Sequence, residues 1–190
     1  MTAVTHRTAD ELLAGLRDIE AAPRDVGRVE LIVRRPSEGE REVLQTGVLN
    51  HSDGIEGDTW NQRSSKRTSD GSPHPDMQLN IMNARAAAVI AGDRDHWSLA
   101  GDQLYIDLDV SVDNLPAGTV LVIGGARGAE IVVTDQPHTG CAKFSQRFGV
   151  EALRFVNSPE GSRVRARGIN ARVLTPGTIA VGDEVVVRRS

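Results

Sequence analysis

The sequence predicts an α+β fold that is rich in strands, with a barrel-like sheet and a few short peripheral helices. Many short runs of β-branched and apolar residues are separated by turn residues along the 190-residue chain. These runs do not alternate with long amphipathic helices, so a doubly wound parallel sheet is not expected. A closed sheet of short strands fits the pattern better. The length suits one domain, which we place at residues 27–190 after an N-terminal helical extension at residues 1–26.

The first expected element is a helix at residues 8–21. Thr8 and Glu11 have the spacing of a capping box, and Pro23 ends the helix. Leucine and isoleucine recur between these ends at helical spacing, which predicts one buried face. We expect this helix to pack against the domain rather than to carry chemistry.

Short strands dominate the part of the chain that follows. The strands expected there are residues 27–34, 43–49, 77–82, 104–109 and 119–123. In the first of them, alternation places Val29, Leu31 and Val33 on one face of the sheet. A polar loop without periodicity, residues 61–76, is long for an internal connection, and such loops are often functional or mobile.

Helical segments are expected at three further places, and strands complete the chain. The helices are residues 84–91, with Asn83 as its cap and Gly92 at its end, residues 141–148, ended by Gly149, and residues 151–156. The remaining strands are residues 130–134, 163–167, 171–174, 178–181 and 184–188. The glycine-rich segment 124–128 leads into a strand, so it predicts a hairpin turn rather than a dinucleotide site.

Composition excludes several classes of function. Cys141 is the only cysteine, which excludes an intrachain disulfide and zinc sites that need several cysteines. The net charge of −4 at pH 7 argues against a general nucleic-acid binder. No apolar run approaches the length of a membrane span, and the N-terminus has no signal core, so we expect a cytoplasmic protein with no membrane contact. Serine hydrolase and calcium-loop motifs are absent.

The surroundings of Cys141 are unusually basic. Residues 136–172 contain seven lysines and arginines but only two acids. At the start of a helix, with Lys143, Arg147 and His138 nearby, the thiolate form of Cys141 is favoured over the thiol. Gly140 lacks a side chain, which is expected to let a bulky ligand approach the sulfur. The alternative is a buried cysteine that only packs, and the residues alone do not decide between the two.

Three arginines follow at alternate positions. Arg163, Arg165 and Arg167 would lie on one face of the strand predicted at residues 163–167. Such a face could clamp a phosphate, because guanidinium groups pair with phosphate oxygens in a fork. An exposed edge strand protected by charge explains the same spacing.

Taken in order, several segments resemble the MOSC domain, the family named after the C-terminal domain of molybdenum cofactor sulfurase. The resemblance covers about residues 27–183. The matching pieces are Gly54-Ile55-Glu56-Gly57-Asp58, Gln78-Leu79-Asn80, residues 100–104, 115–119 and 122–124, residues 136–144 with Cys141, and residues 168–172 and 177–183. The chain departs from the family pattern at Gly140, where many members have proline, and at Asp102-Gln103, which stand in place of Glu-Asn.

The resemblance implies a strand-rich barrel that holds a molybdenum–pterin cofactor (molybdopterin). By position, Cys141 would be the metal ligand and the catalytic residue. Their charge assigns Lys143, Arg147, Arg165 and Arg167 to the pterin or its phosphate. Asn80, Asp102, His138 and Thr139 complete the expected cofactor-binding set.

The function implied is that of a molybdenum-dependent oxidoreductase that reduces N-hydroxylated or N-oxygenated small molecules. The chain has no cysteine set for an iron–sulfur cluster and no nicotinamide fingerprint, so electrons would come from an external electron-transfer partner. A monomer or homodimer is expected. The alternative is a non-catalytic carrier of the cofactor or of sulfur, with a persulfide on Cys141.

Overall fold

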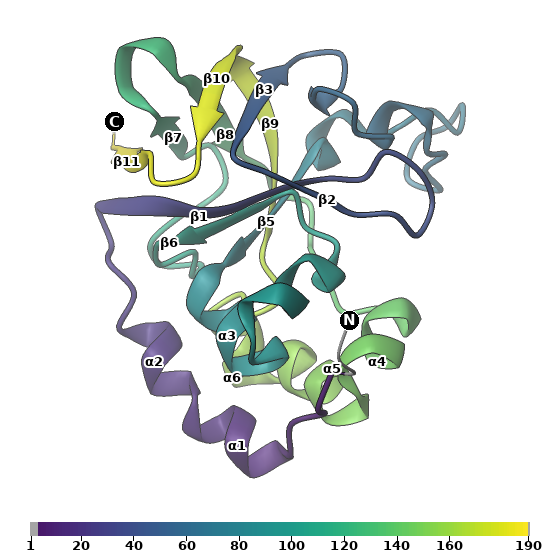
Figure 1. Cartoon of the computed structure of the whole chain (residues 1–190), viewed down its shortest axis with the longest axis vertical. Helices are drawn as coiled ribbons and strands as arrows, with labels where there is room; N and C mark the ends of the chain where they lie inside the picture. The colour runs from purple at the N-terminus through teal and green to yellow at the C-terminus, as the bar shows by residue number, and fades with distance from the viewer. Residues whose placement is uncertain (1–3, 190) are drawn as a thin grey trace.

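Seven strands close into a barrel in the computed structural model, which describes residues 4–189 (Figure 1). Around the barrel the strands are β11 (Glu184–Arg188), β7 (Val120–Ile123), β8 (Ala129–Val133), β9 (Ile169–Thr175), β5 (Leu79–Asn83), β6 (Leu104–Asp107) and β1 (Val26–Arg34). Pairing of β1 with β11 closes the ring, and β5 with β6 is its one parallel pair among the described strands. The predicted barrel-like α+β fold is confirmed.

Further strands extend the barrel at one end. Strand β2 (Glu42–Leu44) pairs with the end of β1, and a small second sheet joins β10 (Gly177–Ala180), β3 (Thr46–Asn50) and β4 (Gly54–Ile55). The strand predicted at residues 43–49 is therefore two strands that belong to different sheets.

The α-helices gather on one side of the barrel (Figure 1). They are α1 (Ala9–Ala14), α2 (Leu16–Glu20), α3 (Ala84–Ala91), α4 (Ala142–Phe148), α5 (Val150–Asn157) and α6 (Pro159–Arg163). The predicted capping box is confirmed, because Thr8 and Glu11 exchange both hydrogen bonds. The expected first helix is interrupted at Gly15. Short 3-10 helices lie at Trp60–Gln62, Pro75–Met77, Arg94–Ala100 and Gly125–Arg127. None of the helices between residues 4 and 189 has both the length and the apolar character of a bilayer span.

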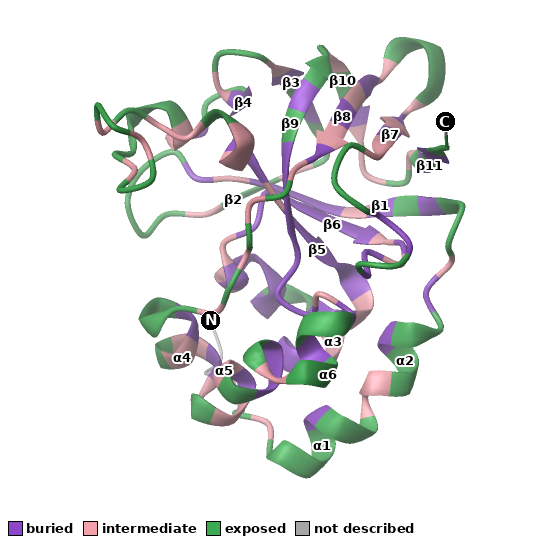
Figure 2. Ribbon diagram, turned by 180° about the vertical axis from the view of Figure 1, so that it is seen from behind, coloured by how far each residue is buried: buried purple, intermediate pink, exposed green. Residues whose placement is uncertain are grey.

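Strands β1, β5 and β6 separate two hydrophobic cores, and β5 and β6 are buried along most of their length (Figure 2). One core fills the barrel, and the other lies between the barrel wall and the helices. Val29 belongs to the barrel core, whereas Leu31 and Val33 belong to the helical core. The prediction that all three share one face is wrong, because a bulge shifts the register of β1 against β6 between Val29 and Leu31.

Residues 163–167 do not form the predicted strand. Ser158 caps α6 through the Gly161 N–H, so the chain makes another helical turn beyond the helix predicted to end at residue 156. A turn then carries residues 164–167 to β9, with Arg165 at a φ of 47°. The boundary between N-terminal extension and domain stays a prediction.

Candidate functional site

Cys141 lies at the junction between the barrel and the helical layer. Residues 134–141 have no regular structure and join β8 to α4, whose N-cap is Cys141. The Cys141 side chain is exposed. The alternative in which this cysteine is a buried packing residue is therefore wrong.

Gly140 packs against α5 rather than leaving room for a ligand. A Cβ atom at this position would lie 2.6 Å from Cδ1 of Leu153 and 2.9 Å from Cγ2 of Val156. The Gly140 N–H also donates to Oδ1 of Asn157 at 3.3 Å. The expectation that Gly140 opens a path to the sulfur is wrong, because helix α5 fills that space.

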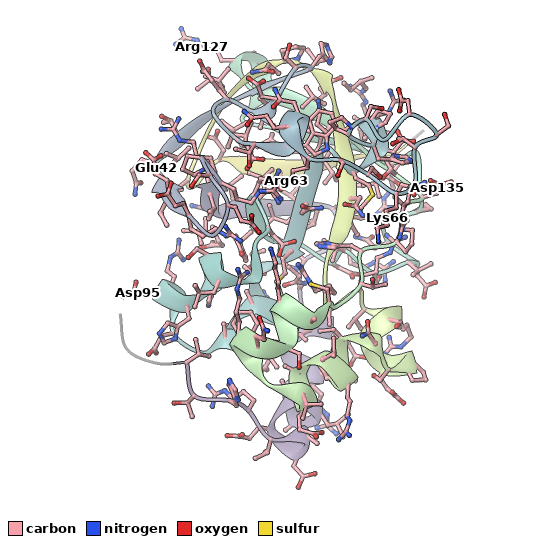
Figure 3. All side chains as sticks on the ribbon, turned by 90° about the vertical axis from the view of Figure 1, so that its right-hand side faces the viewer. Glu42, Arg63, Lys66, Asp95, Arg127 and Asp135 are labelled. Atoms are coloured by element: carbon pink, nitrogen blue, oxygen red, sulfur yellow. The ribbon has the colours of Figure 1, made fainter. Side chains whose placement is uncertain are left out.

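A large basic cavity lies beside the first turns of α4. Its volume is about 980 Å³, and its walls come from the β1–β2 connection, the start of the long loop and α4. Arg41, Arg63, Lys143 and Arg147 line it, and Glu38 is the acid among the residues that line it. Figure 3 faces this side of the molecule, with Arg63 near its middle. We call this space the basic cavity.

The cations of the basic cavity are only partly compensated. Lys143 forms an exposed ion pair with Glu38, at 2.8 Å between Nζ and Oε1. Burial lowers the pKa of Arg41, and the neighbouring Arg147 and Arg35 lower it further. Burial also lowers the pKa of Arg63, again with Arg35 as a contributing cation. The Nε atom of Arg41 is buried without a hydrogen-bond partner. These conditions favour an anionic ligand.

A smaller cavity of about 260 Å³ is bordered by the segment that leads to Cys141. His138, Thr139, Arg165 and Arg167 are among the residues that line it. The long loop covers the same region, since Arg67 Nη1 donates to Oε1 of Gln136 at 3.0 Å. Figure 3 shows Lys66 of that loop and Asp135 on the same side of the molecule.

A buried ion pair lies behind the smaller cavity. Nη1 of Arg167 donates to Oδ2 of Asp102 at 2.7 Å, and Nδ1 of His138 is 3.5 Å from Oδ1 of Asp102. Burial raises the pKa of Asp102, and the Arg167 guanidinium opposes that shift. Burial lowers the pKa of His138 well below its ordinary value, and Arg167 adds to the effect, so the imidazole is neutral near pH 7.

A second polar network joins Arg35 to the wall of the barrel. Arg35 pairs with Asp58, and its Nη1 donates to Oδ1 of Asn80 at 3.0 Å. Nδ2 of Asn80 in turn donates to Oδ1 of Asn170 at 2.6 Å. Asn80 is therefore a half-buried connector and lines neither of the two cavities described above.

Three successive backbone carbonyls tie the two cavities together. Leu99 O accepts from Arg147 at 2.6 Å, Ala100 O accepts from Arg167 at 3.0 Å, and Gly101 O accepts from Arg35 at 3.0 Å. The carbonyls lie at the end of the 3-10 helix Arg94–Ala100, where Gly101 has a φ of 92°. One turn of backbone thus holds three guanidinium groups that come from three distant parts of the sequence.

The predicted site residues divide between these features. Lys143 and Arg147 line the basic cavity, His138, Thr139, Arg165 and Arg167 line the smaller one, and Asn80 and Asp102 lie behind them.

The common face predicted for Arg163, Arg165 and Arg167 does not exist, because the turn after α6 sends the three side chains in different directions. Arg163 pairs with Glu20, Arg165 donates to Leu115 O at 2.7 Å, and Arg167 pairs with Asp102.

Sequence reasoning missed Arg35, Arg41 and Arg63. They lie far from Cys141 in the sequence, and no local pattern marks them. Asp58, the partner of Arg35, lies within the recognised Gly54–Asp58 segment, but spacing alone could not pair the two.

Comparison with known proteins assigns the family. The MOSC domain profile matches residues 56–186, which is more than half of the chain. The chain belongs to the MOSC domain family. The resemblance noted in the sequence is thus confirmed, and the domain is of a kind associated with the molybdenum cofactor. No curated protein sequence gives a significant match.

Solved structures share the fold of this MOSC domain. YuaD from Bacillus subtilis superposes with a TM-score of 0.58 and 14% identity, over 85% of this chain and 95% of its own. YiiM from Escherichia coli gives a TM-score of 0.54 and 18% identity, over 86% and 70%. YiiM from Geobacillus stearothermophilus gives 0.51 and 14%, over 88% and 75%. Identities this low show a common fold and nothing finer.

Proposed function

We propose that this MOSC domain binds a molybdenum–pterin cofactor through the Cys141 thiolate and reduces N-hydroxylated or N-oxygenated small molecules. One observation carries the proposal: the only thiol of the chain is exposed at the start of the helix whose Lys143 and Arg147 line the basic cavity.

The residues present fit such a cofactor. A thiolate is a soft ligand that suits a metal of this kind. The pterin part carries a phosphate, and the basic cavity offers Arg41, Arg63 and Arg147 with little acidic compensation. Small-molecule sites commonly have volumes of about 300–1,000 Å³. The basic cavity, at about 980 Å³, falls in that range, whereas the smaller cavity, at about 260 Å³, does not.

In this proposal each residue has a separate task. Cys141 holds the metal, and the arginines of the basic cavity orient the anionic end of the ligand. Neutral His138 lies behind the segment that leads to Cys141, where its imidazole is in contact with Asp102. The bound cofactor would supply the two-electron redox chemistry that removes oxygen from the substrate. Electrons would come from a separate protein, and a cytoplasmic location stays part of the proposal.

The test is metal and cofactor content combined with turnover. The chain would be produced in cells that make the cofactor, and molybdenum per chain and the fluorescence of the oxidised pterin would be measured. Turnover of an N-hydroxylated amidine would be followed with a chemically reduced dye as electron donor. We expect both in the wild type and neither in Cys141→Ser. Arg154→Met is the matched control, because Arg154 is exposed and lines neither of these two cavities.

Other outcomes of this experiment distinguish the reductase from the carrier. Molybdenum and pterin bound without turnover of any hydroxylamine or amidoxime would support the carrier alternative, and mass spectrometry of Cys141 would then test for a persulfide. Wild-type protein without molybdenum from competent cells would overturn the reductase and the cofactor carrier, and a persulfide on Cys141 would then support the sulfur carrier.

A further inference from the structure

Cys141 is held in place by its neighbours in the chain rather than by contacts of its own side chain. The side chain is exposed and makes no capping hydrogen bond to α4. The direction in which the sulfur points is therefore decided by the residues on either side.

Both sides are in contact with the same buried ion pair. Three residues before Cys141, the imidazole of His138 lies 3.5 Å from Asp102. Three residues after it, the ring of Phe144 lies under the Arg167 guanidinium, with 5.0 Å between Cζ and the ring centroid. Asp102 and Arg167 are bonded to each other at 2.7 Å. The segment from His138 to Phe144 thus packs at both ends against one pair of side chains.

The ion pair is itself fixed in the fold. The Asp102 side chain is 0% exposed and that of Arg167 is 8% exposed. Arg167 is also bonded to the carbonyl of Ala100, within the turn that holds Arg147 of the basic cavity. The same turn therefore holds Arg167, which contacts the thiol segment, and Arg147, which lines the basic cavity.

Unsatisfied atoms indicate that stability alone does not explain this pair. Among the described residues, four buried side-chain polar atoms lack a partner, and three of them are Asp102 Oδ1, His138 Nδ1 and Arg167 Nε. Buried ion pairs are often no more stabilising than apolar replacements of the same volume, and incompletely bonded buried groups call for a functional reason.

We propose that Asp102 and Arg167 are positioning residues that hold the Cys141 thiol beside the basic cavity, by clamping His138 and Phe144. The importance of that position rests on the proposed function. The clamp itself can be tested in cofactor-free protein, because Cys141 is the only cysteine and every alkylation event reports on it.

Two alkylating reagents that differ by one charge measure the position of the thiol. Iodoacetate is anionic and iodoacetamide is neutral, so the ratio of their rates reports the electrostatic field at the sulfur and not its exposure. In the wild type we expect the ratio to exceed that of a peptide spanning residues 136–146, and to fall as salt is added. A thiol released from the clamp should lose this preference.

Helix α4 offers a matched pair of variants. Phe144 and Phe148 are both buried, and their ring centroids lie 4.9 Å apart. It is the ring of Phe144 that lies under the Arg167 guanidinium. We expect Phe144→Leu to lower the iodoacetate-to-iodoacetamide ratio about threefold, because the released thiol would lie farther from the cations of α4 and the basic cavity. Phe148→Leu should leave the ratio unchanged while costing similar stability.

The other arm of the clamp gives an independent variant with a conservative rescue. His138→Leu should lower the ratio as Phe144→Leu does, whereas His138→Asn, which keeps a donor near Asp102, should retain it. The double variant Asp102→Leu with Arg167→Met removes both charges together, stays free of an unpaired buried ion, and should lower the ratio too.

Molybdenum content of protein from cofactor-producing cells separates this proposal from the proposed function. Loss of molybdenum in Phe144→Leu but not in Phe148→Leu supports both. An altered ratio in Phe144→Leu with no molybdenum even in the wild type keeps the clamp and removes the cofactor. Equal ratios in the wild type, Phe144→Leu and His138→Leu would overturn the clamp, whatever the metal content.

Discussion

Arg35 and Asp58 form a buried bidentate ion pair, with Nε 2.8 Å from Oδ2 and Nη2 2.9 Å from Oδ1. Their side chains are 4% and 0% exposed. Arg35 follows strand β1 and Asp58 follows β4, so the pair joins two segments that form the back of the site. Because Arg35 also bonds Asn80 and Gly101, this pair supports the wall between the barrel and the basic cavity.

Asp58→Asn should destabilise the fold strongly, because it leaves the Arg35 charge buried without a counter-ion. Removing one partner of a buried pair costs about 3–5 kcal/mol. The free energy of unfolding from urea titration measures it. Glu42→Gln is the control: its ion pair with Arg34 is exposed, so a change of at most about 1 kcal/mol is expected. Equal effects of the two changes would contradict the role given to Asp58.

Arg41→Met should weaken anion binding without lowering stability. The charged form of Arg41 is disfavoured by burial and by Arg147 and Arg35, so its removal relieves repulsion in the folded state. Binding of inorganic pyrophosphate, measured by calorimetry, should weaken about tenfold, which corresponds to about 1.4 kcal/mol. Arg154→Met should leave pyrophosphate binding intact. A loss of stability in Arg41→Met with unchanged binding would show that Arg41 is structural.

Stability should fall as the pH is lowered from neutral, in part because of His138. Its pKa in the folded state is well below the ordinary 6.5, owing to burial and to the cations Arg167 and Arg35. Below pH 6.5 the unfolded chain therefore binds a proton that the folded chain does not. This proton binding stabilises the unfolded state and lowers the free energy of unfolding. The contribution reaches about 1.4 kcal/mol per pH unit.

The check is the free energy of unfolding measured between pH 7.5 and pH 5.0 in the wild type and in His138→Asn. The variant should show the shallower dependence in this window, because the amide side chain that replaces the imidazole does not titrate. Parallel curves for the two proteins would mean that other groups account for the whole effect.

Gly140→Ala should destabilise the segment that leads to Cys141. The added methyl group would meet Leu153 and Val156 of α5, and overpacking of this kind costs about 1–3 kcal/mol. Leu153→Ala removes the side chain nearest to the added methyl group. The double variant should therefore lose less stability than the sum of the two single changes, as measured by thermal unfolding. Strict additivity would mean that Gly140 does not touch α5 in solution.

Local patterns were sufficient for most of the secondary structure. The capping box at Thr8 and the cap at Asn83 were predictable because both signals lie within a few residues of the helix they begin. The bulge in β1 was not, because it depends on how β1 pairs with β6. Helix α6 was missed although Ser158 and Pro159 form a local start signal of the same kind.

The sequence by itself determined the fold class, the family resemblance and the one thiol able to bind a soft metal, since Cys141 is the only cysteine of the chain. Only the tertiary structure decided that this thiol is exposed, that Arg41 and Arg63 face Lys143 and Arg147 across a cavity, and that Asp102 and Arg167 hold both ends of its segment. The physical reason is distance along the chain. Charge pairs and carbonyl contacts between residues far apart in sequence depend on how the barrel closes, and no local spacing records them.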